Sequence, residues 1–194
     1  MEVLQPGDIF LTRGRGFVSR AIRFFTRHIG ESRTKVNHVG LVVQGGPIEQ
    51  AVVVEALRNV ERHCLIDEYG GADDQVAIYR PTKLSRAELQ RVVALANGYV
   101  GRGYGYGKIA LHALDWVFQG AYVFRRLGQM DDYPICSWLV AQAYSGVGVH
   151  FGVDAGAATP DDIWDYVTTH HNEFVRVRGL ERLSFPAQPL RAAA

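Results

Sequence analysis

The sequence predicts an α+β fold in which a mostly antiparallel sheet packs against helices. Short β-type runs cluster in the first eighty residues, helical patterns dominate the later part, and one alternating run returns near the end. A run of strands followed by a run of helices is typical of this class. We expect residues 1–185 to form a single domain and residues 186–194 to form a C-terminal tail.

The expected strands are apolar or alternating runs bounded by turn-forming residues. Pro6-Gly7-Asp8 is a turn signal before the first run, and Gly45-Gly46-Pro47 separates two others. These boundaries predict strands at 9–12, 38–43, 51–57, 59–65, 75–79 and 174–178.

The expected helices follow from apolar spacing and from caps. Ser85 and Glu88 are spaced as a capping box, and Thr159 stands before Pro160 at a first helical position. Together with the apolar spacing elsewhere, they predict helices near 16–27, 85–99, 108–118, 136–144 and 160–170.

Composition and charge exclude several classes of protein. The 194 residues are 47% hydrophobic and 21% charged, as in ordinary globular domains. The formal net charge of +1 gives no overall attraction to nucleic acid or to a membrane surface, so we expect no nucleic-acid partner. A local run of arginines over residues 13–27 is either a solvated helix face or a site for an anionic polymer.

The N-terminal sequence and the cysteines indicate the cellular compartment in which the protein is expected to function. No basic segment followed by an apolar stretch opens the chain, so we see no signal peptide, and no apolar run is long enough to span a bilayer. Cys64 and Cys136 allow one disulfide but do not resemble a disulfide-dense scaffold. We therefore expect a reducing compartment, with the protein cytoplasmic or part of a larger particle. Its oligomeric state is left open.

Cys136 is the candidate nucleophile. It stands where the helix at 136–144 is expected to begin, and the positive end of a helix dipole favours the reactive thiolate. The alternative is a small buried residue, which is the commonest role of a free cysteine.

His38 is the candidate base for this thiol. It lies in the apolar run at 38–43, where alternation puts Gly40 on its face and leaves room for another group to approach. The alternative is a hydrogen-bonded core histidine. The other histidines have no evident partner: His63, for example, neighbours Cys64 on a strand, where successive side chains face opposite ways. No histidine or cysteine spacing resembles a zinc site, so we expect no metal and no cofactor.

Glu55 is the third candidate. It interrupts a run that otherwise suits burial, and a buried carboxylate requires a partner. A histidine on the adjacent strand would be such a partner, which Glu55 would orient as the acid of a catalytic triad does. The alternative is an edge-strand glutamate that reaches solvent.

Five motifs in this order resemble the circularly permuted papain-like amidases of the NlpC superfamily, the YiiX-type group. The resemblance covers about residues 6–170, and its histidine, acid, cysteine order is the permuted one. The motifs are Gly7-Asp8-Ile-Phe, Asn37-His38-Val-Gly-Leu-Val, Val54-Glu55-Ala56, Gly101-Arg-Gly-Tyr104 and Ile135-Cys136-Ser-Trp-Leu-Val.

This resemblance implies a permuted papain-like, NlpC-type fold with Cys136 as nucleophile, His38 as base and Glu55 as orienting acid. It also implies that Tyr104 borders the site as a substrate-binding residue. A phenol there could donate to a developing oxyanion alongside the backbone N–H of Cys136, and the alternative is aromatic packing. The sequence departs from the family pattern at three positions that we expect on the walls of the cleft, namely Asn37, Gly105 and Trp138.

The function that we expect is a thiol hydrolase that cleaves an amide bond in a peptide or a peptidoglycan stem peptide. Its partner would be a peptide, cell-wall or acyl-amide substrate. An acyltransferase or lipid hydrolase of the lecithin–retinol acyltransferase type is the first alternative, because the aromatic stretch at 116–124 could line an acyl site. A catalytically silent binding module is the second.

The expected site also has a definite geometry. His38 and Glu55 should lie on adjacent antiparallel strands and face the same side of the sheet. The helix that begins at Cys136 should pack its first turn against that same face, which would bring the sulfur to the imidazole.

Overall fold

A computed structural model of the chain describes residues 2–14, 35–57, 59–70, 74–103 and 135–183. Several predictions fall outside these ranges. They are the helices near 16–27 and 108–118, the arginines after Arg13, the aromatic stretch at 116–124, Tyr104, Gly105 and the tail at 186–194.

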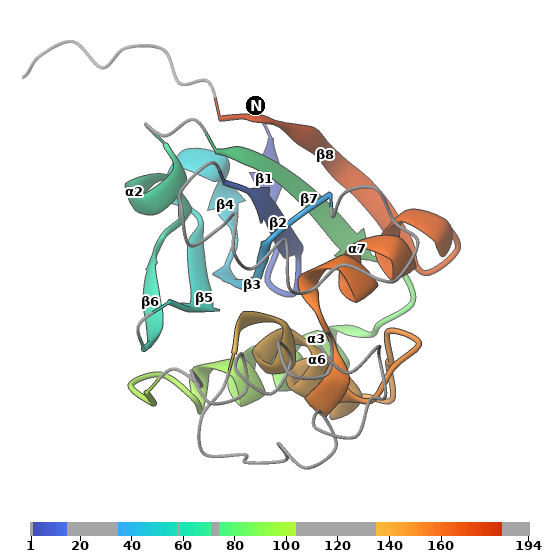
Figure 1. Cartoon of the computed structure of the whole chain (residues 1–194). Helices are drawn as coiled ribbons and strands as arrows, with labels where there is room; N and C mark the ends of the chain where they lie inside the picture. Colours follow the sequence, from blue (N-terminus) through green and yellow to red (C-terminus); the bar gives the residue numbers. More distant parts are fainter. Residues whose placement is uncertain (1, 15–34, 58, 71–73, 104–134, 184–194) are drawn as a thin grey trace, which may run out of the picture.

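A six-stranded sheet forms the centre of the described fold (Figure 1). Its order is β6-β5-β3-β2-β7-β8, and every neighbouring pair is antiparallel. The strands are β2 (Ile9–Arg13), β3 (His38–Gln44), β5 (Val52–Ala56), β6 (Val60–Cys64), β7 (Gln75–Pro81) and β8 (Phe174–Arg182). The six predicted strands are therefore present, and β8 continues four residues beyond its predicted end at Arg178.

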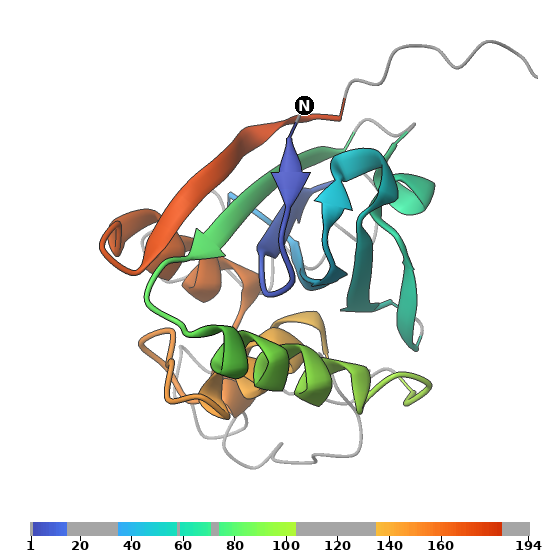
Figure 2. The same ribbon diagram turned by 180° about the vertical axis from the view of Figure 1, so that it is seen from behind.

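Smaller elements that the sequence pattern did not predict flank this sheet. The two-residue strands β1 (Val3–Leu4) and β4 (Gly46–Pro47) pair beside it, as Figure 2 shows. The short helix η1 (Ile48–Gln50) precedes β5, and α2 (Leu65–Tyr69) follows β6 at once.

The longer helices begin where the sequence predicts. They are α3 (Arg86–Asn97), α6 (Cys136–Ser145) and α7 (Pro160–Thr169), and the short η2 (Ala155–Ala157) lies between the last two. The capping box of Ser85 and Glu88 is formed, and Thr159 caps α7 with Asp162 as its third helical residue. These caps satisfy backbone N–H groups that a helix start leaves without partners.

The two faces of the sheet bury different sets of side chains. One face, with Leu11, Val39 and Leu41 among its residues, packs against α3, α6 and α7. The opposite face, with Phe10 and Val42, packs against α2 and the segment before β5. Alternation along each strand assigns these sets, because successive side chains point to opposite sides.

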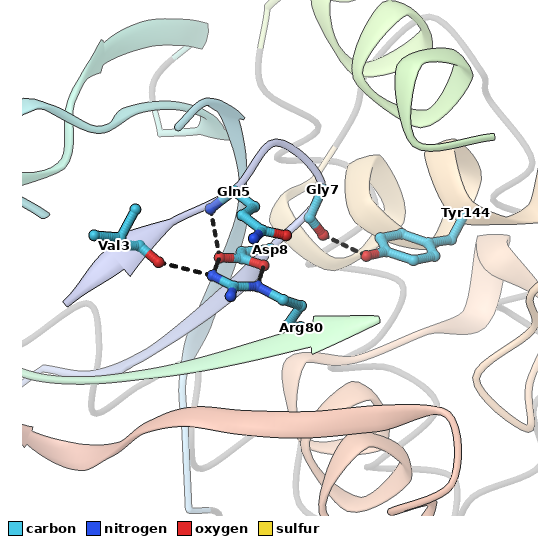
Figure 3. Close-up of polar contacts among 6 residues, drawn as sticks. All are labelled: Val3, Gln5, Gly7, Asp8, Arg80 and Tyr144. Carbon is cyan, nitrogen blue, oxygen red and sulfur yellow. Dashed lines mark hydrogen bonds and ion pairs between the residues drawn. The ribbon is translucent and has the colours of Figure 1, made fainter. Parts of the chain in front are cut away.

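A polar network joins the N-terminal turn, the sheet and α6 (Figure 3). The guanidinium of Arg80 donates to both oxygens of the buried Asp8 at 2.8 and 2.7 Å, and to the carbonyl of Val3 at 2.8 Å. The hydroxyl of Tyr144, on α6, donates to the carbonyl of Gly7 at 2.5 Å. Because the backbone of Gly7 and Asp8 also bonds to Val42 of β3, this turn connects the cysteine-bearing helix to the histidine-bearing strand.

Candidate active site

The first turn of α6 holds Cys136 in a buried position. Ile135 is the N-cap in an extended conformation, and Cys136 is the first helical residue, with 3% of its surface exposed. The hydroxyl of Ser137 donates to the carbonyl of Ala158 at 2.6 Å, which fixes this turn against the segment that follows η2. The backbone N–H of Ser137, in the first turn of α6, and that of Val39, on β3, favour the thiolate of Cys136.

His38 begins β3 and lies between Cys136 and Glu55. Its Nε2 is hydrogen-bonded to Oε2 of Glu55, and the thiol of Cys136 is close enough to the imidazole for the two groups to interact through their charges. The ring of Phe10, whose centroid is 6.4 Å from that of the imidazole, lies beside it. The structure therefore brings all three residues together, although they are far apart in the sequence.

Glu55 is completely buried within the sheet. Besides His38, two further side chains contact its carboxylate: the hydroxyl of Tyr69 donates to Oε2 at 2.6 Å, and Nε2 of His63 lies 2.7 Å from Oε1. A carboxylate with this many partners keeps its charge in an apolar setting. Glu55 is therefore not the solvent-reaching edge residue of the alternative interpretation.

The opposite charges of Glu55, His38 and Cys136 shift the pKa of each group toward its ionised form. Burial would raise the pKa of Glu55, but the charge and hydrogen bond of His38, the close contact of His63 and the hydrogen bond from Tyr69 lower it to about 2. Burial would likewise lower the pKa of His38, but the charges of Cys136 and Glu55 and their hydrogen bonds raise it to about 10. Burial opposes the thiolate of Cys136 as well, yet the charge of His38 and the hydrogen bonds to the sulfur lower its pKa. The arrangement thus favours a thiolate–imidazolium pair beside an ionised Glu55.

The sheet places His38 and Glu55 on one face, as expected, but α6 lies on the other. β3 and β5 are antiparallel neighbours, and the side chains of His38 and Glu55 share the face of Phe10. The body of α6 packs with Val39 and Leu41 on the opposite face. The prediction that α6 packs on the face of His38 was therefore wrong. Cys136 approaches the imidazole at the start of β3, because His38 is the first residue of that strand.

Gly40 provides the space that the sequence indicated. A Cβ atom at this position would overlap the ring of Phe10 and would lie 2.9 Å from Cβ of Glu55. Only a residue without a side chain lets the Phe10 ring and Glu55 approach β3 this closely.

His63 and Tyr69 were missed by the sequence interpretation. In the β5–β6 hairpin Glu55 pairs with Glu61, so His63, two residues further on, is a diagonal neighbour on the same face. That relation could have been found from the hairpin register. The contact from Tyr69 could not, because it depends on α2, which the sequence pattern did not predict.

Two of the departures from the family pattern are buried side chains. Asn37 is buried, and its side-chain oxygen accepts from the backbone N–H of Gly14 at 2.7 Å. Trp138 is 2% exposed and packs edge-on against Tyr99, with ring centroids 5.0 Å apart. Both side chains therefore make contacts inside the fold, and their place on the walls of the cleft stays a prediction.

Neither a metal-binding cluster nor a membrane-spanning helix occurs within the described residues. In these ranges, no three or more His, Cys, Asp or Glu side chains are grouped so that they could hold a metal ion. No helix in the described parts of the chain has the length and apolar character needed to cross a membrane.

A buried thiol at a helix start, beside an imidazole that bonds to a buried carboxylate, is the arrangement expected of a papain-like cysteine hydrolase. The family model of the permuted papain-like amidase enzymes YaeF/YiiX, the C92 family, matches residues 3–177, and the chain belongs to this family. The predicted family, the fold class and the cysteine peptidase or amidase class are thereby confirmed.

A solved structure has the same fold. The crystal structure of the metalloprotein yiiX from Escherichia coli O157:H7 superposes with a TM-score of 0.52 at 20% sequence identity, over 89% of this chain and 88% of that one. No curated protein matches the sequence. The family establishes a hydrolase of amide bonds with a peptide-type substrate.

Proposed function

We propose that this protein cleaves an amide bond through an acyl-thioester on Cys136, with His38 as the general base and Glu55 as the acid that orients it. The observation that carries this proposal is the series from Cys136 through His38 to the buried Glu55, in which the imidazole bonds to the carboxylate and interacts with the charge of the sulfur. A thiolate needs a nearby cation in a buried site, and the imidazolium of His38 provides it.

The proposed reaction has two steps. In the first, the sulfur of Cys136 attacks the carbonyl carbon, and the proton on His38 passes to the leaving nitrogen as the C–N bond breaks. In the second, His38 takes a proton from water, the resulting hydroxide attacks the thioester, and the C–S bond breaks to release the carboxyl product and the thiolate. Glu55 keeps its charge throughout and stabilises the imidazolium.

The substrate that we propose is a peptide or a peptidoglycan stem peptide. The amidase family supports the peptide character, and the cell-wall origin is our proposal. Both substrates present an amide carbonyl to the sulfur of Cys136, so the same two steps serve either one.

We also propose that Tyr104 borders the substrate and donates to the oxyanion together with the backbone N–H of Cys136. Tyr104 itself lies outside the described residues. Its neighbour Gly103 pairs with Asn59 between β5 and β6, the hairpin that carries Glu55 and His63, and this supports the proposal.

A substrate screen tests this function. Labelled peptides, cell-wall fragments and acyl lipids should be incubated with the wild type and with Cys136→Ala, and free amines and carboxyl products measured. We expect release from a peptide or cell-wall fragment by the wild type alone. Turnover of acyl lipids only would favour the acyltransferase or lipase alternative, and equal turnover by Cys136→Ala would overturn the proposal.

A further inference from the structure

One carboxylate oxygen of Glu55, Oε1, lies against His63, a histidine that takes no part in the proposed reaction. Oε2 is bound by His38 and Tyr69, whereas Oε1 faces Nε2 of His63 at 2.7 Å. This contact has the distance of an ion pair, although its angle is not that of a straight hydrogen bond. The carboxylate is therefore held from both sides.

Both ring nitrogens of His63 face acceptors. Nε2 faces the carboxylate, and Nδ1 lies 3.0 Å from the carbonyl oxygen of Cys64. A neutral imidazole carries one N–H and leaves the other nitrogen as an acceptor, whereas an imidazolium donates at both. The geometry at His63 therefore suits the charged form.

The charged groups around His63 favour the same state. Glu55 of β5 and Glu68 of α2 are negative, and the close contact with Glu55, which outweighs burial, raises the pKa of His63. Glu61 and Arg62, its neighbours on β6, are both exposed. The side chain of His63 is 19% exposed, whereas the carboxylate is fully enclosed, so His63 exchanges protons with solvent more readily than Glu55.

We propose that His63 is a positioning residue of this active site, which as an imidazolium holds Oε1 of Glu55 and so keeps Oε2 directed at His38. The catalytic part of this inference rests on the proposed function. When His63 loses its proton, it retains one of its two contacts, and the carboxylate is held less firmly. The position of the Glu55 carboxylate thus depends on a proton on His63, which is separate from the thiolate–imidazolium pair.

Nuclear magnetic resonance of the ¹⁵N-histidine-labelled full chain tests the charge state. His63 should carry protons on both ring nitrogens at a pH where an unperturbed histidine has lost one. In Glu55→Gln, His63 should lose this proton at lower pH than in the wild type. A neutral His63 at that pH in the wild type would overturn the inference, and this result does not depend on whether Glu55→Gln folds.

The rate of alkylation of Cys136 by iodoacetamide tests the positioning role. His63→Leu removes both donors and should slow the reaction at neutral pH about tenfold, since the ion-pair contact with the buried Glu55 is lost. His63→Gln retains an amide donor and should restore most of the rate, whereas His150→Gln, a change at an exposed histidine, should match the wild type. Rates are compared per folded molecule, from unfolding curves of each variant.

The outcomes separate this inference from the proposed function. Equal rates in His63→Leu and the wild type, with Cys136 still the preferred thiol, would overturn the role of His63 alone. A wild type in which Cys136 is no more reactive than an ordinary thiol would overturn the proposed function.

Discussion

Replacing Glu55 by glutamine should remove a specific pH dependence of stability. Glu55 is fully buried, and its pKa is about 2 in the folded chain against 4.5 for an unperturbed glutamate. A depressed pKa means that the unfolded chain binds more protons between these values, so the stabilisation is present above pH 4.5 and is lost as the pH falls toward 2. The two values correspond to about 3 kcal/mol, as an order of magnitude.

Urea unfolding followed by circular dichroism at several pH values measures this contribution. The free energy of unfolding of the wild type should fall by about 3 kcal/mol more than that of Glu55→Gln between neutral pH and about pH 2. Glu61→Gln is the matched control, because Glu61 pairs with Glu55 across the hairpin but is exposed. Parallel pH profiles for the wild type and Glu55→Gln would refute the buried, ionised carboxylate.

Glu55→Gln should also slow the reaction strongly, on the order of 10⁴-fold if Glu55 matters as much as the aspartate of a serine-protease triad.

Two further substitutions test the packing around the site. Gly40→Ala should lower the free energy of unfolding by about 1–3 kcal/mol, because its Cβ would overlap the ring of Phe10; an unchanged urea midpoint would contradict the tight contact. Arg80→Met should cost about 3–5 kcal/mol by leaving the buried Asp8 without its ion-pair partner. The double variant with Asp8→Asn should recover part of this loss, and a loss in the double variant equal to the sum of the losses in the two single variants would show that the pair is not coupled.

The sequence predicted the elements that local signals define. The cap at Ser85, the proline after Thr159 and the start of α6 at Cys136 all depend on residues within a few positions. The antiparallel pairing of β3 and β5 followed in the same way, from a turn between two apolar runs.

What the sequence could not predict depends on tertiary packing. The side of the sheet on which α6 packs is decided by how its apolar residues meet Val39 and Leu41, and alternation alone leaves both sides open. The donor from Tyr69 depends on α2, a five-residue helix too short to give a clear periodic pattern. Burial of Asn37 is likewise a result of the fold, because a polar residue beside a histidine gives no local sign of it.

The most direct test of the central claim is the reactivity of the two cysteines toward iodoacetamide. Brief alkylation near neutral pH, followed by mass mapping, should label Cys136 before Cys64, because the helix start and His38 lower the pKa of the Cys136 thiol. His38→Ala should abolish this preference while the chain remains folded. Preferential labelling of Cys64, or a Cys136 rate that His38→Ala does not change, would contradict the account.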